Sequence, residues 1–381
     1  MKVTIAIDSF KGSLSSDAAG QAAAEGILTV LPHAKTQIFP LADGGEGTVH
    51  AITSALGGKR CRVRVCGPLG DSVEAEYGVI AETRTAIIEM SAAAGITLIP
   101  AEKRNPLLTT TYGVGELITH AIREHHCNRF LIGIGGSATN DGGVGMLQAL
   151  GFSFLDSQGN EIPRGARGLA SLDTVCCDGA MQELTACEFS IACDVTNPLC
   201  GELGCSAVYG PQKGATPDMI RDMDRWLSHY ATLSEDATGR QAATAPGAGA
   251  AGGMGFSFLS YLGGELKSGI QLVMDAIRLE DAIRDSDVVI TGEGRLDGQT
   301  AMGKAPVGVA RLAKKHGKPV LAFAGCVTEE ATACNKEGID AFFPILPAPC
   351  SPEVAMNPDN AYENMKRTVE QVFRLIHCFH S

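Results

Sequence analysis

The chain has 381 residues, of which 45% are hydrophobic and 19% are charged, and its formal net charge is −12. This composition predicts a globular protein with apolar cores and excludes a disordered chain. The length favours two or three domains. An acidic chain without a block of lysines or arginines is a poor candidate for binding nucleic acid or an anionic membrane, so we expect neither partner.

The cysteines and the N-terminus indicate where the protein resides. The thirteen cysteines are odd in number and lack the paired close doublets of a zinc site, which favours reduced and mostly buried thiols. The opening run MKVTIAIDSF loses its apolar character at Asp8, too early for a secretory signal. No apolar stretch is long enough to span a bilayer. We therefore expect a cytoplasmic protein.

Short β-branched runs alternate with alanine- and leucine-rich stretches at both ends of the chain. The first part predicts strands over 3–7 and 37–41 and helices over 16–31 and 48–56. Such alternation is typical of parallel strands joined by right-handed crossovers, with helices on both faces of the sheet. The last part predicts strands over 287–291, 320–324 and 341–345 and helices over 304–316 and 361–376.

The middle of the chain differs from its ends. Between residues 60 and 89 the runs CRVRVCGP, EAEYGVIA and TAIIEM are strand-like with little helix between them, which indicates antiparallel hairpins. Further strands are expected over 131–133, 152–155 and 189–193. We therefore predict an α/β protein of two domains. Residues 60–264 form a second α/β domain inserted into a parallel-sheet domain built from 1–59 and 265–381.

Polar residues collect where the predicted strands end. Ligands of open α/β sheets bind outside the carboxyl ends of the strands, and glycines there let backbone N–H groups approach an anion. Carboxylates beside such donors fit a hard cation such as Mg²⁺, or a hydroxyl that gives up its proton. The acidic residues at these positions are Asp8, Asp43, Asp141, Asp194 and Glu293.

Positive charge also gathers in the glycine-rich turns. Lys11 lies in DSFKGS, Lys213 in GPQKGA, Lys304 in MGKAP and Arg295 in GEGR. An acidic protein that handles an anionic nucleotide needs such local positive charge. The turns together predict a site for a Mg-nucleotide and a small hydroxylated acceptor.

Two segments resemble nucleotide-binding motifs in part. Gly298–Lys304 has the spacing of a phosphate-binding loop, but Ala305 stands where that loop needs Ser or Thr to hold Mg²⁺. We interpret Thr291–Pro306 instead as one wall of a composite cleft. Glu293, Arg295 and Asp297 are expected on a loop that follows a strand, and Lys304 at the start of a helix.

The second segment is Gly133–Ala138, which fits the dinucleotide-binding fingerprint, with Asp156 about where a ribose-binding acid belongs. This pattern keeps open an alternative, an NAD(P)-dependent oxidoreductase of a small hydroxy acid. The polar run Ser137–Asp141 argues against it, because it occupies the place where the helix of that motif should begin.

Seven segments occur along the chain in the order DSFKGS, ADGGEGT, GIGGSATNDGG, ACDVTNPL, GPQKGA, GAGAAGGMG and TGEGRLDGQT with GKAP. Together they resemble the bacterial glycerate kinases of the glycerate kinase type-1 family. The resemblance implies a flavodoxin-like domain built from both chain ends and an inserted α/β domain of the restriction-enzyme-like type. It also implies Mg²⁺-dependent transfer of the γ-phosphoryl of ATP to D-glycerate, giving 2-phospho-D-glycerate in this branch. Two departures are Ile7, where Pro is expected, and Cys205, where Gly or Ala is usual.

Roles for individual residues follow as expectations. We expect Lys11 and Lys213 to contact phosphate, and Asp194 or Asp8 to accept the hydroxyl proton. Arg295 is expected to clamp the glycerate carboxylate, because its planar fork suits bidentate pairing. Asp43 and Asp194 are candidates for binding Mg²⁺ or orienting the acceptor. The remaining expected substrate-binding residues are Asn140, Glu293 and Asp297, and the expected phosphate-facing residues are Gly44, Gly45, Gly135, Gly136, Ser137 and Gly142.

Overall fold

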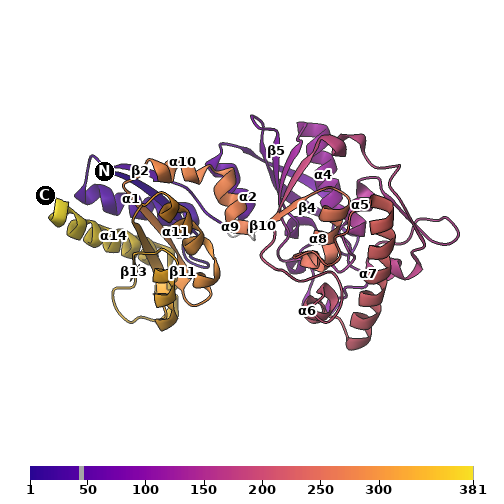
Figure 1. Cartoon of the computed structure of the whole chain (residues 1–381). Coiled ribbons are helices and arrows are strands. Elements are labelled where there is room, and N and C mark those ends of the chain that lie inside the picture. Colours follow the sequence, from indigo (N-terminus) through magenta and orange to yellow (C-terminus); the bar gives the residue numbers. More distant parts are fainter. Residues whose placement is uncertain (43–46, 381) are drawn as a thin grey trace. The chain divides into compact units, whose positions relative to one another are not determined.

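The structure is a computed structural model that describes residues 1–42 and 47–380, apart from the side chains of His50 and His380. Its contacts divide the chain into two compact units, which Figure 1 colours along the sequence. The first unit comprises Met1–Asp43 and Val273–Ser381, and the second comprises Gly44–Leu272. Both units combine helices with a sheet that contains parallel strands, so the predicted α/β class is confirmed.

The first unit is built on a parallel sheet of five strands in the order β13-β12-β11-β1-β2. Counted along this unit alone, the order reads 2-1-3-4-5, which is the order of flavodoxin-like sheets. The strands are β1 (Lys2–Ile7), β2 (Lys35–Ile38), β11 (Val288–Leu296), β12 (Val320–Val327) and β13 (Ala341–Pro344). The helices are α1 (Ser16–Val30), α10 (Leu279–Arg284), α11 (Ala305–Lys315), α12 (Ala333–Lys336), α13 (Pro352–Met356) and α14 (Pro358–His380). The boundary between the two units falls within α9 (Gly269–Ala276).

Alternate residues of β1 line one face of this sheet. Val3, Ile5 and Ile7 are buried in one hydrophobic cluster with residues of α1 and α14, because every second side chain of a strand points to the same face. The two helices lie side by side in Figure 1. Small residues of α1 permit this approach, since a Cβ added to Gly26 would lie 2.4 Å from the carbonyl oxygen of Lys366.

The second unit is built on a mixed sheet of six strands in the order β10-β9-β6-β5-β4-β3. Its first three strands in sequence pair antiparallel, which confirms the hairpins predicted between residues 60 and 89. The strands are β3 (Lys59–Cys66), β4 (Ser72–Ile80), β5 (Thr85–Glu89), β6 (Arg129–Gly133), β9 (Glu188–Ala192) and β10 (Glu265–Lys267), and β7 (Ser153–Leu155) and β8 (Thr174–Cys176) form a separate pair. The helices are α2 (Thr48–Ala55), α3 (Ser91–Ala94), α4 (Tyr112–His125), α5 (Val144–Ala149), α6 (Cys205–Tyr209), α7 (Pro217–Thr238) and α8 (Ala250–Ser260).

The units do not divide where the sequence suggested. The predicted boundaries stood at 59/60 and 264/265, whereas the contacts divide the chain at 43/44 and 272/273. The difference arises mainly from α2, which was expected in the first domain. This helix packs on β3, β4 and β5 and therefore belongs to the second unit.

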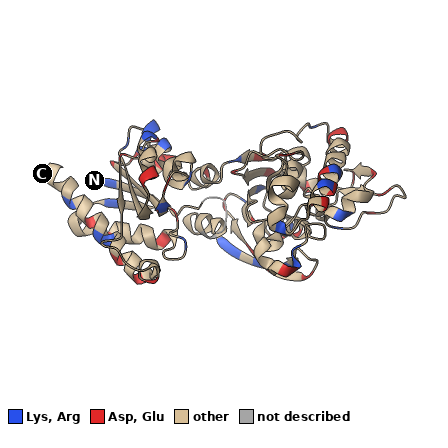
Figure 2. Cartoon of the chain, turned by 90° about the horizontal axis from the view of Figure 1, so that it is seen from below, with Lys and Arg blue, Asp and Glu red and all other residues tan. Residues whose placement is uncertain are grey.

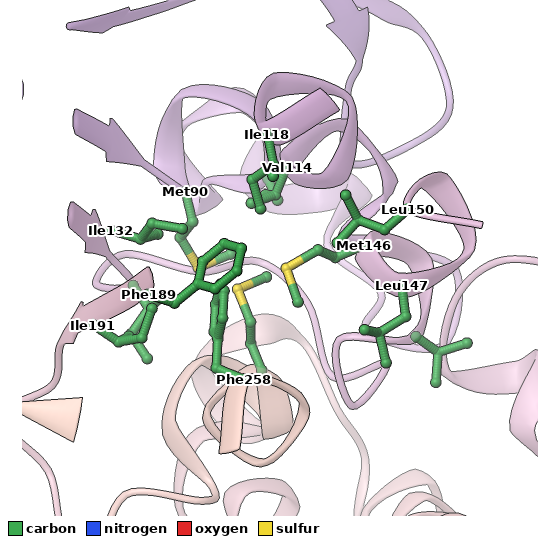
Figure 3. Packing of buried hydrophobic residues seen from close by; sticks show 14 of the residues in the cluster. Met90, Val114, Ile118, Ile132, Met146, Leu147, Leu150, Phe189, Ile191 and Phe258 are labelled. Carbon is green, nitrogen blue, oxygen red and sulfur yellow. The ribbon is translucent and has the colours of Figure 1, made fainter. Parts of the chain in front are cut away.

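The core of the second unit lies between its sheet and its helices (Figure 3). Ile132 of β6 and Ile191 of β9 are fully buried, and Phe130 stacks on Phe189 with 4.8 Å between ring centroids. This core fixes the ends of β6 and β9, from which the loops with predicted site residues emerge. The helices contribute Val114, Ile118, Met146, Leu147 and Phe258, and Leu150 follows α5.

The strand β11 is longer than the sequence suggested. It was predicted over 287–291 but continues to Leu296, pairing Arg295 with Cys326 of β12. Gly292 permits this close pairing, because a Cβ there would lie 2.1 Å from the carbonyl oxygen of Phe323. The prediction that Glu293 and Arg295 lie on a loop after the strand is therefore wrong, and both are residues of the strand itself.

The surface carries charges of both signs. Figure 2 shows Lys and Arg interspersed with Asp and Glu on both units.

All thirteen cysteines are free thiols. Within the part of the chain that the structure describes, no helix has the combination of length and apolar character that crossing a membrane requires. The expectation of no nucleic-acid partner stays a prediction.

A left-handed turn begins α8 and packs against the loop after β6. Ala251, Gly252 and Gly253 all have positive φ, at 53°, 68° and 93°. Gly252 accepts a hydrogen bond from the N–H of Gly142 at 2.9 Å, and a Cβ added to Gly252 would lie 2.1 Å from the carbonyl oxygen of Thr139. The glycine is thus required twice, for its backbone angles and for the approach of the two loops.

We predict that Gly252→Ala destabilises the protein much more than Gly239→Ala. Both glycines have nearly the same φ, 68° and 70°. Both variants therefore place an alanine in the left-handed region, which destabilises the folded state by about 1–2 kcal/mol. Only Gly252 has a backbone atom in the way, whereas a Cβ on Gly239 meets nothing within 4 Å. Overpacking should add about 1–3 kcal/mol. The midpoint of thermal unfolding checks this, and equal midpoints for the two variants would contradict it.

Candidate active site

The carboxyl ends of β1 and β11 lie side by side at the switch point of the first sheet. The two strands are parallel neighbours, with Ile7 opposite Gly292, and the N–H of Asp8 donates to the carbonyl oxygen of Gly292 at 2.9 Å. From this point the chain leaves β1 toward β2 on one side and continues from β11 toward β12 on the other. In doubly wound sheets this position forms the ligand crevice.

A cavity of about 370 Å³ opens at this point within the first unit. Residues that follow β1 form one side and residues at the end of β11 form another, and apolar residues near β13 and α13 complete it. Its charged residues are Asp8, Lys11, Glu293, Arg295, Asp297 and Lys304. The structure therefore brings together five residues predicted for the site, Asp8, Lys11, Glu293, Arg295 and Asp297, and adds Lys304.

Lys11 is placed by a tight loop between β1 and α1. The N–H of Phe10 donates to the carbonyl oxygen of Leu14 at 2.8 Å, and the N–H of Leu14 returns a bond to Phe10 at 3.1 Å. Gly12, with φ of 87°, makes the turn possible. This pairing leaves the side chain of Lys11 exposed at the tip of the loop, beside the cavity.

Glu293 is a buried carboxylic acid in this cavity. Its side chain accepts a hydrogen bond from the hydroxyl of Thr300 at 2.5 Å, and the residue is only 9% exposed. Burial raises the pKa of the Glu293 carboxyl to about 7; the Thr300 hydroxyl and Lys304 oppose the shift, whereas Asp8 and Asp297 add to it. Glu293 can therefore exchange a proton near neutral pH, as a general acid or base does.

Arg295 and Asp297 lie at the cavity as a loose ion pair. Arg295 Nε and Asp297 Oδ2 are 3.5 Å apart, and the arginine side chain is 65% exposed. Asp297 is the more constrained of the two, because it accepts from the backbone N–H groups of Gln299 and Thr300. Because it is largely exposed, the guanidinium of Arg295 is accessible to a ligand. Lys304 is the N-cap of α11, which agrees with its expected place at the start of a helix.

In the second unit, the loop between β6 and α5 is fixed from within by Asp141. This side chain is fully buried and accepts from the backbone and hydroxyl of Thr111 and from the N–H groups of Gly143 and Gly145. Burial raises the pKa of Asp141, and these hydrogen bonds oppose the shift. Asp141 therefore shapes the loop and does not face solvent.

Lys213 holds the same loop from another side. It is 2% exposed, and its ammonium donates to Ser137 Oγ at 2.8 Å and to the carbonyl oxygen of Thr139 at 2.6 Å. Burial lowers the pKa of Lys213 to about 8, while Cys205 and Asp141 oppose the shift. The expected phosphate contact of Lys213 stays a prediction. In the structure its ammonium holds the loop between β6 and α5 in place through Ser137 and Thr139.

The other residues predicted in this loop differ in exposure. Gly135 and Gly136 are exposed, whereas Ser137, Asn140 and Gly142 are buried. Asn140 donates through Nδ2 to Ser206 Oγ at 2.8 Å, and its Oδ1 has no hydrogen-bond partner among the described residues. Only the two exposed glycines offer backbone directly to a ligand.

Asp194 follows β9, whose last residue, Ala192, pairs with Gly133 at the end of β6. Its side chain is exposed, and Oδ1 accepts from the N–H of Gly269 at 2.9 Å, at the start of α9. The predicted site residues Asp43, Gly44 and Gly45 lie outside the described residues. Among the described residues, no group of three or more His, Cys, Asp or Glu side chains could hold a metal ion by itself.

The fingerprint segment Gly133–Ala138 does not have the geometry of a dinucleotide site. Such a site needs the glycine turn to open directly into a helix. Here β6 ends at Gly133 and α5 begins only at Val144, with the loop held by Asp141 and Lys213 in between. The NAD(P)-dependent alternative is therefore not supported.

A cavity lined by acidic and basic side chains at the switch point of a parallel sheet lies where doubly wound α/β proteins bind their ligands. The model of the glycerate kinase family matches residues 3–377. The chain therefore belongs to the glycerate kinase family.

Individual relatives match along nearly the whole chain. The chain is 51% identical over 346 residues to a glycerate kinase of Haemophilus influenzae, which covers 91% of each protein. It is 47% identical over 372 residues to a glycerate 2-kinase of Escherichia coli, which covers 98% of this chain and 97% of the relative. A crystal structure from Salmonella typhimurium LT2 that carries the name glycerate kinase 2 matches with a TM-score of 0.92 and 46% identity, covering 100% of this chain and 99% of that one.

We predict that Glu293→Gln makes the protein's stability less dependent on pH. Because the pKa of Glu293 is raised from 4.5 to about 7 on folding, its contribution is fully present below pH 4.5 and is lost as pH rises through 7. The loss amounts to about 3 kcal/mol. Gln keeps an acceptor for the Thr300 hydroxyl but does not titrate.

Thermal unfolding of both proteins between pH 4.5 and pH 8 checks this. The variant should gain stability relative to the parent as pH rises, and exposed Glu329→Gln should show no such trend. A difference between Glu293→Gln and the parent that stays constant with pH would contradict the assignment of the shift to Glu293.

Proposed function

We propose that the protein transfers the γ-phosphoryl group of ATP to D-glycerate, giving 2-phospho-D-glycerate and ADP. The observation that carries this proposal is membership of the glycerate kinase family over residues 3–377. The relative named glycerate 2-kinase, at 47% identity, favours the 2-hydroxyl as the acceptor. The charged cavity of the first unit supports the proposal, because phosphoryl transfer requires mainly positioning and neutralisation of charge.

Lys11 is proposed to contact the transferring phosphoryl group. Its side chain lines the cavity from the tip of a loop that hydrogen bonds hold in place. A donor fixed before the reaction stabilises charge in the transition state without reorganisation. Lys213 remains a candidate for a second phosphate contact, because the hydrogen bonds described here use two of its three donors.

The acceptor hydroxyl needs a group that takes its proton. Asp8 and Asp194 are the candidates from sequence, and Glu293 joins them because its pKa of about 7 suits a base at neutral pH. Arg295 is proposed to hold the glycerate carboxylate, since its guanidinium is largely exposed at the cavity. A planar fork matches a carboxylate in two hydrogen bonds.

Mg²⁺ is proposed to accompany ATP, and the residues present fit it. In nucleotide sites this ion takes one or two carboxylates and fills its shell with phosphate oxygens and water, so a cluster of protein ligands is not required. Asp194 is an exposed carboxylate that follows β9, and Asp43 is the other candidate from sequence. When bound, the ion would neutralise charge on the β- and γ-phosphates.

An assay of ADP release over a panel of hydroxy acids tests the proposed reaction. We expect release with D-glycerate and only background release without an acceptor. Carbon and phosphorus NMR of the product then separates the 2-phosphate from the 3-phosphate. Release of ADP that ignores glycerate would overturn the proposal, and the 3-phosphate would overturn only the choice of hydroxyl.

We predict that Lys11→Ala lowers kcat by about 10²–10³, equivalent to ~3–4 kcal/mol, because it removes one preorganised donor. Lys35→Ala is the matched control, since Lys35 is exposed at the amino end of β2, away from the strand ends that form the cavity. Steady-state kinetics with D-glycerate and ATP give the comparison. A near-normal kcat for Lys11→Ala would remove Lys11 from the site.

We predict that Asp194→Asn lowers turnover by roughly 10²–10⁴, the contribution of a positioned general base. Asn retains an oxygen that can accept from the N–H of Gly269, so the start of α9 and the fold should persist. Circular dichroism checks the fold and the coupled assay checks turnover. If turnover persists, Asp194 is not the base, and Asp8 and Glu293 become the candidates to test.

A further inference from the structure

The cavity of the first unit is lined by charged residues at one end and by apolar residues at the other. Its charged residues lie after β1, within β11 and between β11 and α11, whereas Ile345 and Leu346 follow β13, with Gly325 and Cys326 of β12 between them. Neighbouring strands are about 4.8 Å apart, so β11 and β13 are separated by about 10 Å. The cavity therefore has a charged end at β1 and β11 and an apolar end beside β13.

The apolar end is closed by α13. Met356 lines the cavity from this short helix and is 45% exposed. Its Cε would lie 2.6 Å from a Cβ added to Gly12, so the side chain reaches the loop that carries Lys11. Methionine is flexible and polarisable, which suits it to cover a flat aromatic ligand.

The size and the lining do not suit glycerate alone. A volume of about 370 Å³ falls in the range of drug-sized ligands, about 300–1,000 Å³, whereas glycerate is a three-carbon acid. Every carbon of glycerate bears oxygen, so it gains little from Ile345, Leu346 and Met356. A nucleotide has both characters, an apolar base joined to anionic phosphates.

We propose that the apolar end of this cavity, formed by Ile345, Leu346 and Met356, binds the nucleoside base of ATP. The phosphates then extend along the edge of the sheet toward Lys11 and Lys304 at the charged end. This inference rests on the proposed kinase function, and it assigns the nucleotide to the first unit. The opposite arrangement, with glycerate alone in this cavity, is the outcome that the experiment must distinguish.

The variant Met356→Asp tests the apolar end, with Val354→Asp as its control. Both residues lie on α13 and are half exposed, at 45% and 50%, but only Met356 lines the cavity. Calorimetry measures the binding of ADP and of inorganic pyrophosphate to the full chain. We expect Met356→Asp to weaken ADP about tenfold or more while pyrophosphate changes less than twofold, because only ADP carries a base. Val354→Asp should change neither.

Steady-state kinetics separate this inference from the kinase function itself. Met356→Asp should raise KM for ATP and leave KM for D-glycerate within twofold. An unchanged affinity for ADP, or a rise in KM for glycerate alone, would overturn the nucleotide assignment while the kinase function stands. Failure of the parent protein to phosphorylate glycerate would instead remove the proposed function, and ADP binding would still report on the cavity.

Discussion

The pairing of β1 with β11 is the contact on which the candidate site depends. It sets Ile7 opposite Gly292 and joins Asp8 to the carbonyl oxygen of Gly292, so that two acidic strand ends meet at one point. Parallel pairing at a switch point opens a crevice there, because the segments that follow the two strands depart in opposite directions. The glycine is needed because β12 approaches on its other side, where any Cβ would meet Phe323.

The charged residues that line the cavity are buried to different extents. Three carboxylates and three cations line it, and Glu293 is the most enclosed of those in the strand β11. An enclosed acid beside other acids holds its proton more tightly, and the raised pKa of Glu293 expresses that cost. A ligand that brings phosphate and metal charge would change this balance, so occupancy of the cavity and protonation of Glu293 are coupled.

Much of this arrangement could be predicted from the sequence, and the failures have physical causes. Alternating strand and helix patterns predicted the parallel sheet and its acidic strand ends. The sequence does not predict the continuation of β11, because Gly292 and Gly294 resemble a turn. In the structure Gly292 permits the pairing with β12, and Gly294 lies against the backbone of Phe10. A pattern also does not say which way a polar side chain points. Asp141 and Lys213 follow the same glycine-rich signals as surface residues, yet both turn inward.

The apolar end of the cavity gave no signal in the sequence. Ile345 and Leu346 follow a strand, as core residues commonly do, and Met356 lies more than ten residues after the end of β13. Only the fold shows that they line the cavity that Lys11 also lines. Binding sites made of apolar residues on separate elements are therefore the part of such a protein that sequence patterns reveal least.

A crystal structure of the protein with ADP and D-glycerate bound would show where the nucleotide lies. We expect the phosphates of ADP in the cavity between the ends of β1 and β11, within hydrogen-bonding distance of Lys11. An empty cavity, with both ligands held entirely by the second unit, would contradict it.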